Sequence, residues 1–202
     1  MSSYSSLSHV GFIFLGIAVL NNLALTGAVF LMVAHGFLAA LLFALNGWLH
    51  QQTGGTSMEN MGGLIQKMPF IGFIMSATLL AGCGLPFFGN FVGEFLVLFG
   101  AWKSAWHWPA ALAVFTGLII SAVYMLRAIR RVLHGEFPAE LSGAMDAQCA
   151  WRKLPYVLLI AGLLAIGTWP MLLTSKMKEA VNQTLEPVFS LTTPDQTNTP
   201  SE

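Results

Sequence analysis

The sequence predicts an all-α integral membrane protein of about five transmembrane helices, the third of which is discontinuous. Of its 202 residues, 55% are hydrophobic and only 9% are charged, whereas soluble domains carry about 25% charged residues. The apolar residues form continuous runs of membrane-spanning length and do not alternate as barrel strands do. These observations exclude a water-soluble fold, and the high hydrophobicity also excludes a disordered chain.

The charged residues are balanced in sign and confined to a few places. Nine Lys and Arg against nine Asp and Glu give a net charge of +0, so the chain lacks the basic field that nucleic acids require. No charged residue precedes Glu59, whereas eight lie between Arg127 and Lys153 and six between Lys176 and Glu202. The lipid bilayer, and not nucleic acid, is therefore the expected surrounding of the apolar stretches.

Five apolar segments reach the length of about 20 residues that a transmembrane helix needs. The segments are 3–20, 23–49, 69–102, 108–130 and 154–174. The first two contain no charged residue, the third contains a single carboxylate, and the last two flank the charged loop. Together they predict a helical bundle over residues 1–175. The polar remainder, 176–202, has little to bury and is predicted to be a flexible C-terminal tail.

The third segment is too long to be one straight span. Its 34 residues would measure about 51 Å as a helix, against a hydrocarbon core of about 30 Å. Residues of low helix propensity, Gly82, Gly84, Pro86 and Gly89, interrupt its middle, and proline also lacks a backbone donor. We therefore predict two half-helices with a break at 82–90. Discontinuous helices of this kind mark ion sites in transporters.

Glu94, just after this break, is the only charged residue well inside any of the five segments. An ionised carboxylate near the bilayer centre costs about 2.5–3.5 kcal/mol on the insertion scale. The carboxyl group must therefore be paired, hydrated or protonated, and each condition makes Glu94 a candidate proton-exchange site. The alternative is that Glu94 lies near an interface and extends its carboxylate toward water.

Two histidines, His9 and His35, lie within the first and second segments. Imidazole titrates near neutral pH and suits a proton relay, so both are candidate relay residues. Each histidine alone is equally compatible with a neutral ring that makes one interhelical hydrogen bond. The sequence contains no cluster of Cys or carboxylates at ligand spacing and no nucleotide-binding glycine loop, so we expect neither a metal site nor a bound cofactor in this chain.

Four motifs in the sequence together resemble a known family. They are Ser5-Ser6-Leu7-Ser8-His9-Val10-Gly11-Phe12, Ala34-His35-Gly36, Met61-Gly62-Gly63-Leu64, and Gly84-Leu85-Pro86 followed by Gly89-Asn90-Phe91-Val92-Gly93-Glu94-Phe95. Their order and spacing resemble the antiporter-like proton-translocating subunits of respiratory complex I. The M-type subunit, called subunit 4 in mitochondria, is the most similar, because its L and N relatives carry lysine at the position of Glu94.

The resemblance implies a proton-translocating membrane subunit of NADH:quinone oxidoreductase that couples quinone reduction to proton transport. It implies that Glu94 exchanges protons with the outer side, that His9 and His35 lie on a hydrated central axis, and that no redox site or cofactor resides in this chain. The resemblance extends only to the C-terminal half-bundle of a larger protein. The implied partners are therefore other membrane subunits, including a chain that supplies the missing N-terminal helices. One departure is Phe87, where the family has glycine.

Two other functions remain open at this stage. One is a subunit of a related membrane-bound hydrogenase or cation/proton antiporter complex, and the other is a non-catalytic or decayed structural fragment.

The basic residues predict the orientation of the helices. Six of them, against three, lie on the side of the loop between the fourth and fifth segments, which favours a C-terminus outside the cytoplasm. The six are Lys67, Arg127, Arg130, Arg131, Arg152 and Lys153, and the three are Lys103, Lys176 and Lys178. With the resemblance, this indicates a multi-pass protein of the bacterial inner membrane with a periplasmic C-terminus.

Overall fold

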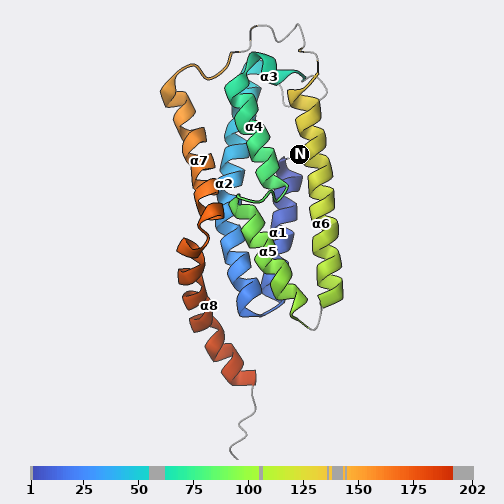
Figure 1. Ribbon diagram of the computed structural model, residues 1–202, viewed down its shortest axis with the longest axis vertical. Coiled ribbons are helices and arrows are strands. Elements are labelled where there is room, and N and C mark those ends of the chain that lie inside the picture. The colour runs from blue at the N-terminus through green and yellow to red at the C-terminus, as the bar shows by residue number, and fades with distance from the viewer. Residues whose placement is uncertain are drawn as a thin grey trace, which may run out of the picture.

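The computed structural model describes residues 2–54, 62–104, 107–135, 137, 143 and 145–192. Within these residues every regular element is helical, which confirms the all-α class (Figure 1). The elements are α1 (Ser2–Ala18), α2 (Asn22–Thr53), α3 (Leu64–Lys67), α4 (Pro69–Gly82), α5 (Gly89–Trp102), α6 (His107–Ala128), the π-helical turn η2 (Ile129–Leu133), α7 (Ala150–Thr168) and α8 (Met171–Thr192).

The helices form an elongated bundle around α2, which contains 32 residues and runs the full height of the bundle. In Figure 1, α7 lies on one side, α6 lies on the other, and α4 and α5 follow one another between them. Helix α1 begins about midway along the bundle and accompanies only its lower part. Buried side chains of α2 pack in one hydrophobic core with buried side chains of α4, α6 and α7.

Glycines bring α2 and α5 into close backbone contact. A Cβ atom added to Gly93 would lie 2.9 Å from Cα of Leu31, and one added to Gly100 would lie 2.7 Å from Cα of Ala24. Only residues without a side chain permit this approach, as in other membrane helix pairs. Gly93 therefore serves close helix packing. This contact fixes the first half of α5 against α2.

Among the residues that the structure describes, three helices are long and apolar enough to cross a membrane. They are Asn22–Thr53, Ala110–Leu133 and Ala150–Thr168. The apolar helices α4 and α5 contain 14 residues each, or about 21 Å apiece, and follow one another across the bundle (Figure 1). The predicted discontinuous third helix is therefore confirmed.

The break between α4 and α5 contains two residues with left-handed backbone. Gly84 has φ +73° and Phe87 has φ +81°, a conformation that is unfavourable for a bulky side chain. The side chain of Phe87 is 70% exposed, so its bulk points away from the core. Behind the break, α7 approaches so closely that a Cβ added to Gly167 would collide with the backbone of Phe87 and Phe88.

Two sequence predictions at the C-terminus are wrong. The fifth segment was predicted to extend to residue 174, but α7 ends at Thr168, because Pro170 disfavours helical conformation in the residue before it. Residues 176–192 were predicted to be a flexible tail but belong to helix α8. Good helix formers (Lys, Met, Glu, Ala) start this segment, and Val181 is buried against the bundle. The rest of the predicted tail, 193–202, lies outside the described residues.

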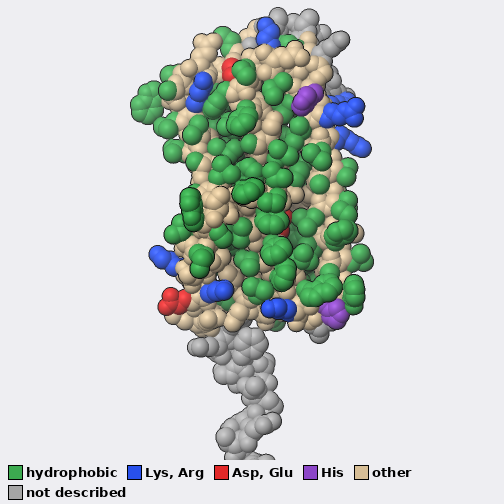
Figure 2. All heavy atoms as spheres, viewed as in Figure 1, with side chains coloured by type: hydrophobic (Ala, Val, Ile, Leu, Met, Phe, Trp, Pro, Cys, Tyr) green, Lys and Arg blue, Asp and Glu red, His purple; other side chains and the backbone are tan. Residues whose placement is uncertain are grey.

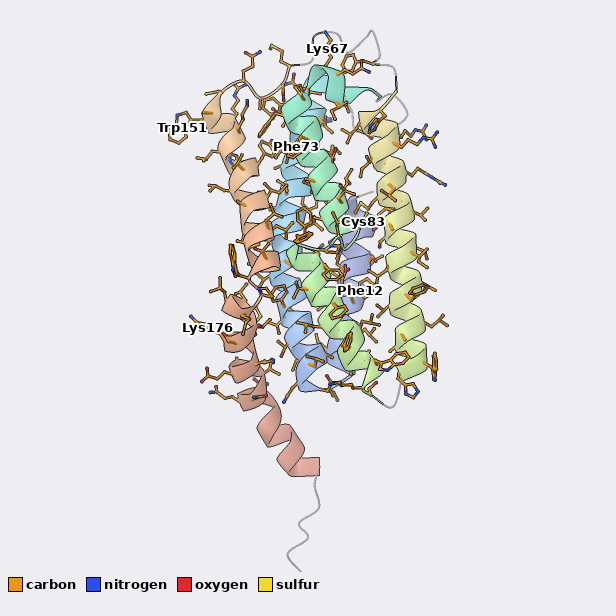
Figure 3. The ribbon with its side chains drawn as sticks, viewed as in Figure 1. Phe12, Lys67, Phe73, Cys83, Trp151 and Lys176 are labelled. Carbon is orange, nitrogen blue, oxygen red and sulfur yellow. The ribbon has the colours of Figure 1, made fainter. Side chains whose placement is uncertain are left out.

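The surface has the character of a membrane protein. Figure 2 shows hydrophobic side chains over the middle of the bundle and the coloured charged side chains mainly near its two ends. Large apolar side chains such as Phe14, Phe43 and Phe73 are more than 60% exposed. Lys67 lies at one end and Lys176 lies toward the other (Figure 3). These features agree with a helical bundle that spans a bilayer.

Asp146, from the loop before α7, caps the N-terminus of α4. Its Oδ2 accepts a hydrogen bond from the backbone N–H of Phe70 at 2.8 Å, and its Oδ1 accepts one from Ile71 at 3.3 Å. The N-cap residue of α4 itself, Met68, makes no side-chain cap. A distant residue therefore satisfies donors that the local sequence leaves free.

We expect Asp146→Ala to destabilise the bundle by about 1–2 kcal/mol, because it removes both cap bonds and a favourable charge at the helix N-terminus. The midpoint of thermal unfolding in detergent measures the effect. Asp146→Asn is the control, since its amide oxygen still caps the helix and should retain most of the stability. Equal midpoints for Asp146→Ala and the wild type would contradict the capping role.

Candidate functional site

The structure brings the three predicted site residues together from three helices: His9 from α1, His35 from α2 and Glu94 from α5. Nε2 of His9 lies 3.3 Å from Oε1 of Glu94. The rings of His9 and His35 are stacked, with centroids 5.0 Å apart and an interplanar angle of 25°. Their clustering is a structural finding, whereas their part in proton exchange stays a prediction.

The fold positions Glu94 inside the bundle. Gly93 packs against the backbone of Leu31 on α2, which directs the next residue toward α1. The side chain of Glu94 is buried, with only 4% of the residue exposed. A carboxylate that extends into water would be accessible, so this burial argues against snorkelling, whereas a carboxyl group tolerated by its packing remains compatible with it.

The hydrogen bonds of His9 determine where its protons lie. Nδ1 is 2.8 Å from the carbonyl oxygen of Ser5, which only accepts, so Nδ1 carries a proton. Nε2 then faces Oε1 of Glu94, and this contact is attractive only when one proton is present on one of the two groups. The pair is thus an imidazolium with a carboxylate or an imidazole with a carboxylic acid. Both forms leave the buried pair neutral, which avoids the cost of an isolated charge.

His35 is held by α1. Its Nε2 lies 2.9 Å from the hydroxyl oxygen of Ser6, and its ring stacks on His9. The bond from His35 on α2 to Ser6 on α1 is also what the alternative interpretation expects, in which the histidine is a neutral ring with one interhelical hydrogen bond. A hydroxyl can donate and accept in turn. Ser6 and His35 thus form one hydrogen-bonded pair, His9 and Glu94 form one close pair, and ring stacking joins the two pairs.

The helix break lies directly beside the carboxyl group. Gly82 ends α4, Gly89 begins α5, and Gly84 and Pro86 lie in the turn between them. A Cβ added to Gly84 would be 2.5 Å from Oε2 of Glu94, so this glycine leaves the space that the carboxyl group occupies. Cys83 marks the level of the break in Figure 3. Of the predicted break residues, Gly84 therefore has the most direct link to the site.

Asn90 is a buried polar residue that the sequence analysis did not select. It lies one turn before Glu94 on α5, is fully buried, and its Nδ2 and Oδ1 have no hydrogen-bond partner among the described residues. Buried amide groups without protein partners usually bond to internal water. The signal in the sequence was its spacing of four residues from Glu94, which places both on one helix face.

Within the residues that the structure describes, no group of three or more His, Cys, Asp or Glu side chains has the arrangement of a metal site.

A family model described as NADH:quinone oxidoreductase/Mrp antiporter, transmembrane, matches residues 1–120. The chain belongs to this family. The matched region contains α1, α2 and the broken helix, so it includes His9, His35 and Glu94.

Relatives within the NADH:quinone oxidoreductase/Mrp antiporter family include subunit M of NADH-quinone oxidoreductases. The chain is 41% identical to NADH-quinone oxidoreductase subunit M of Pseudomonas aeruginosa, over 83% of the chain and 32% of that protein. It is 33% identical to subunit M of Rhodobacter capsulatus, over 89% of the chain and 35% of that protein. The chain thus spans about a third of the length of the curated relatives it matches.

Two solved structures share the fold of this chain. Respiratory complex I from Thermus thermophilus contains a chain that is 31% identical, with a TM-score of 0.78 over 91% of this chain and 39% of that chain. The Mrp complex from Dietzia contains one with a TM-score of 0.78 over 91% of this chain and 42% of that chain, at 20% identity. The second likeness shows the fold alone.

Proposed function

We propose that this chain forms the C-terminal part of a proton-translocating M-type membrane subunit of an NADH:quinone oxidoreductase and couples quinone reduction to proton transport. The observation that carries the proposal is the buried contact between His9 and Glu94 beside a helix break, in a chain of the NADH:quinone oxidoreductase/Mrp antiporter family. The chain itself holds no redox centre in this proposal. It contributes proton transfer to an oxidoreductase whose other subunits carry out the redox reaction.

The proton moves along the series of groups at the site. His9 takes up a proton at Nε2 and passes it to Glu94, whose Oε1 lies 3.3 Å away. His35, bonded to Ser6 and stacked on His9, holds the ring of His9, and in this proposal internal water carries protons from His35 to His9. A charge change nearby then drives Glu94 to release its proton to the outer side. Low dielectric makes such charge changes effective over several ångströms.

In the orientation that we propose, the end with Lys67 faces the cytoplasm and the C-terminus is periplasmic in a bacterial inner membrane. Basic residues near helix ends favour the cytoplasmic side. Arg152 lies over the ring of Trp48 at 5.9 Å, and Lys153 lies over Phe70 at 5.0 Å. Such aromatic and basic pairs are typical of a membrane interface.

The proposed partners are the other membrane subunits of the complex, including the chain that supplies the remaining helices.

The second candidate is a subunit of a cation/proton antiporter. The family model includes Mrp antiporters, and the chain shares its fold with the Mrp complex. The resemblance of the Gly93-Glu94-Phe95 motif to the M-type subunit favours the quinone-linked complex.

The test is to purify the tagged chain in mild detergent from its native membrane and identify the copurifying subunits by mass spectrometry. The complex is then reconstituted into vesicles, and NADH-driven quinone reduction and internal pH are followed together. We expect quinone reductase subunits and proton transport coupled to quinone reduction. Copurification with cation-transport subunits alone, and proton movement that depends on a Na⁺ gradient, would support the antiporter instead.

We expect His35→Ala to lower the ratio of protons transported to quinone reduced by a few fold, without abolishing transport. The variant removes a relay group and the ring that stacks on His9, whereas the His9–Glu94 contact remains. A positioned proton-transfer group typically raises the rate about 10²–10⁴-fold, and we expect a smaller effect here because water can fill the space of the ring. The measurement is vesicle acidification per quinone reduced. His50→Ala, exposed on the same helix, is the matched control and should transport normally. An equal effect of both variants would contradict a relay role for His35.

A further inference from the structure

Two cavities between α5 and α6 form one groove that reaches the candidate site. The first, of about 300 Å³, adjoins the helix break, and the second, of about 500 Å³, continues toward the far end of α5. Leu98 and Leu118 line both cavities, so the two adjoin along α5 and α6. Their volumes lie in the range of small-molecule sites, about 300–1,000 Å³.

The groove is apolar except at one end. Among the described lining residues of both cavities, Glu94 is the only charged one. Its Oε1 faces His9, whereas its Oε2 is buried and has no hydrogen-bond partner within the described part of the chain. A carboxylate oxygen can accept two or more hydrogen bonds. One end of the groove therefore presents an acceptor without a donor.

The other end of the groove is aromatic. Trp102 and Trp108 meet edge to face with ring centroids 5.4 Å apart, and Phe99 and Phe115 line the wall beside them. Trp102 lies eight positions after Glu94, which corresponds to about 12 Å along α5. A ligand that touched both ends would need a compact polar head and an extended apolar tail.

We propose that this groove binds a lipophilic primary ammonium ion, with its head on Oε2 of Glu94 and its alkyl tail along α5 and α6 toward Trp102 and Trp108. The ammonium supplies the donors that Oε2 lacks, and a charge-assisted bond is strongest where water is scarce. An anionic head would be repelled by the carboxylate. Binding of the ammonium ion depends on the geometry of the groove and not on proton transport, so either proposal can fail without the other.

The test uses the chain purified together with its membrane subunits, in detergent. Tryptophan fluorescence is titrated with dodecylamine brominated at the end of its tail, and with the matching brominated dodecanol. Bromine quenches tryptophan on contact. A charge-assisted hydrogen bond corresponds to about a tenfold lower half-saturating concentration for the amine than for the alcohol. Replacement of both Trp102 and Trp108 by Phe should remove this quenching.

Two variants examine the position of the head. Glu94→Gln should make amine and alcohol equivalent. Leu118→Phe, at the junction of the two cavities, should also remove the preference while leaving Glu94 in place, whereas Ile120→Phe, exposed on α6 and lining neither cavity, should not. Equal quenching by both probes in the wild type, or an amine preference that persists in Glu94→Gln, would overturn the proposal.

Discussion

Replacing Glu94 with Gln is expected to reduce proton transport to background while leaving the assembled complex intact. Glutamine has nearly the same shape and cannot take up or release a proton. It also keeps a polar contact with His9, because its amide N–H can donate to Nε2 of a neutral imidazole. The buried pair remains neutral, so little loss of stability is expected. Vesicle acidification during quinone reduction measures the effect.

Glu179→Gln is the matched control, because Glu179 is an exposed carboxylate on α8. It removes the same charge from the chain and should transport protons like the wild type. Size-exclusion profiles and subunit content must be the same for both variants. Undiminished acidification by Glu94→Gln in an intact complex would refute the assignment of Glu94 as the proton-exchange residue.

The membrane class and the discontinuous helix could be predicted from sequence because both depend on local properties. A 34-residue apolar segment that is too long for a bilayer, with glycines and a proline in its middle, leaves few other solutions. The end of α7 and the existence of α8, in contrast, could not be predicted from the sequence. Polar residues in α8 suggested a tail, but its stability depends on packing of Val181 against a distant part of the chain.

The candidate site was predicted as a set of residues but not as an arrangement. His9, His35 and Glu94 were selected because polar groups are rare in membrane helices. The sequence contains no information on which nitrogen of His9 faces Glu94, since this depends on the crossing of α1, α2 and α5. Asp146 was missed for the same reason: it caps a helix 76 positions away in the chain. Long-range contacts of this kind become visible only in the folded structure.

Gly84→Ala is expected to abolish proton transport with only a modest loss of stability. Gly84 has φ +73°, and alanine in this conformation costs about 1 kcal/mol. The added Cβ would also lie 2.5 Å from Oε2 of Glu94, which is too close for two unbonded atoms. Because the carboxyl group is the far end of a flexible side chain, it can move away. That movement would separate Glu94 from His9.

Gly54→Ala separates these two effects. Gly54 ends α2 with a similar φ of +68°, and a Cβ added there would meet nothing within 4 Å. We therefore expect both variants to lower the unfolding midpoint in detergent by a similar amount, but only Gly84→Ala to lose vesicle acidification. If both variants transported protons equally well, the space beside Gly84 would not be needed for the position of the carboxyl group. If Gly54→Ala also lost transport, backbone strain alone would account for the effect, and the contact between Gly84 and Glu94 would have no separate role.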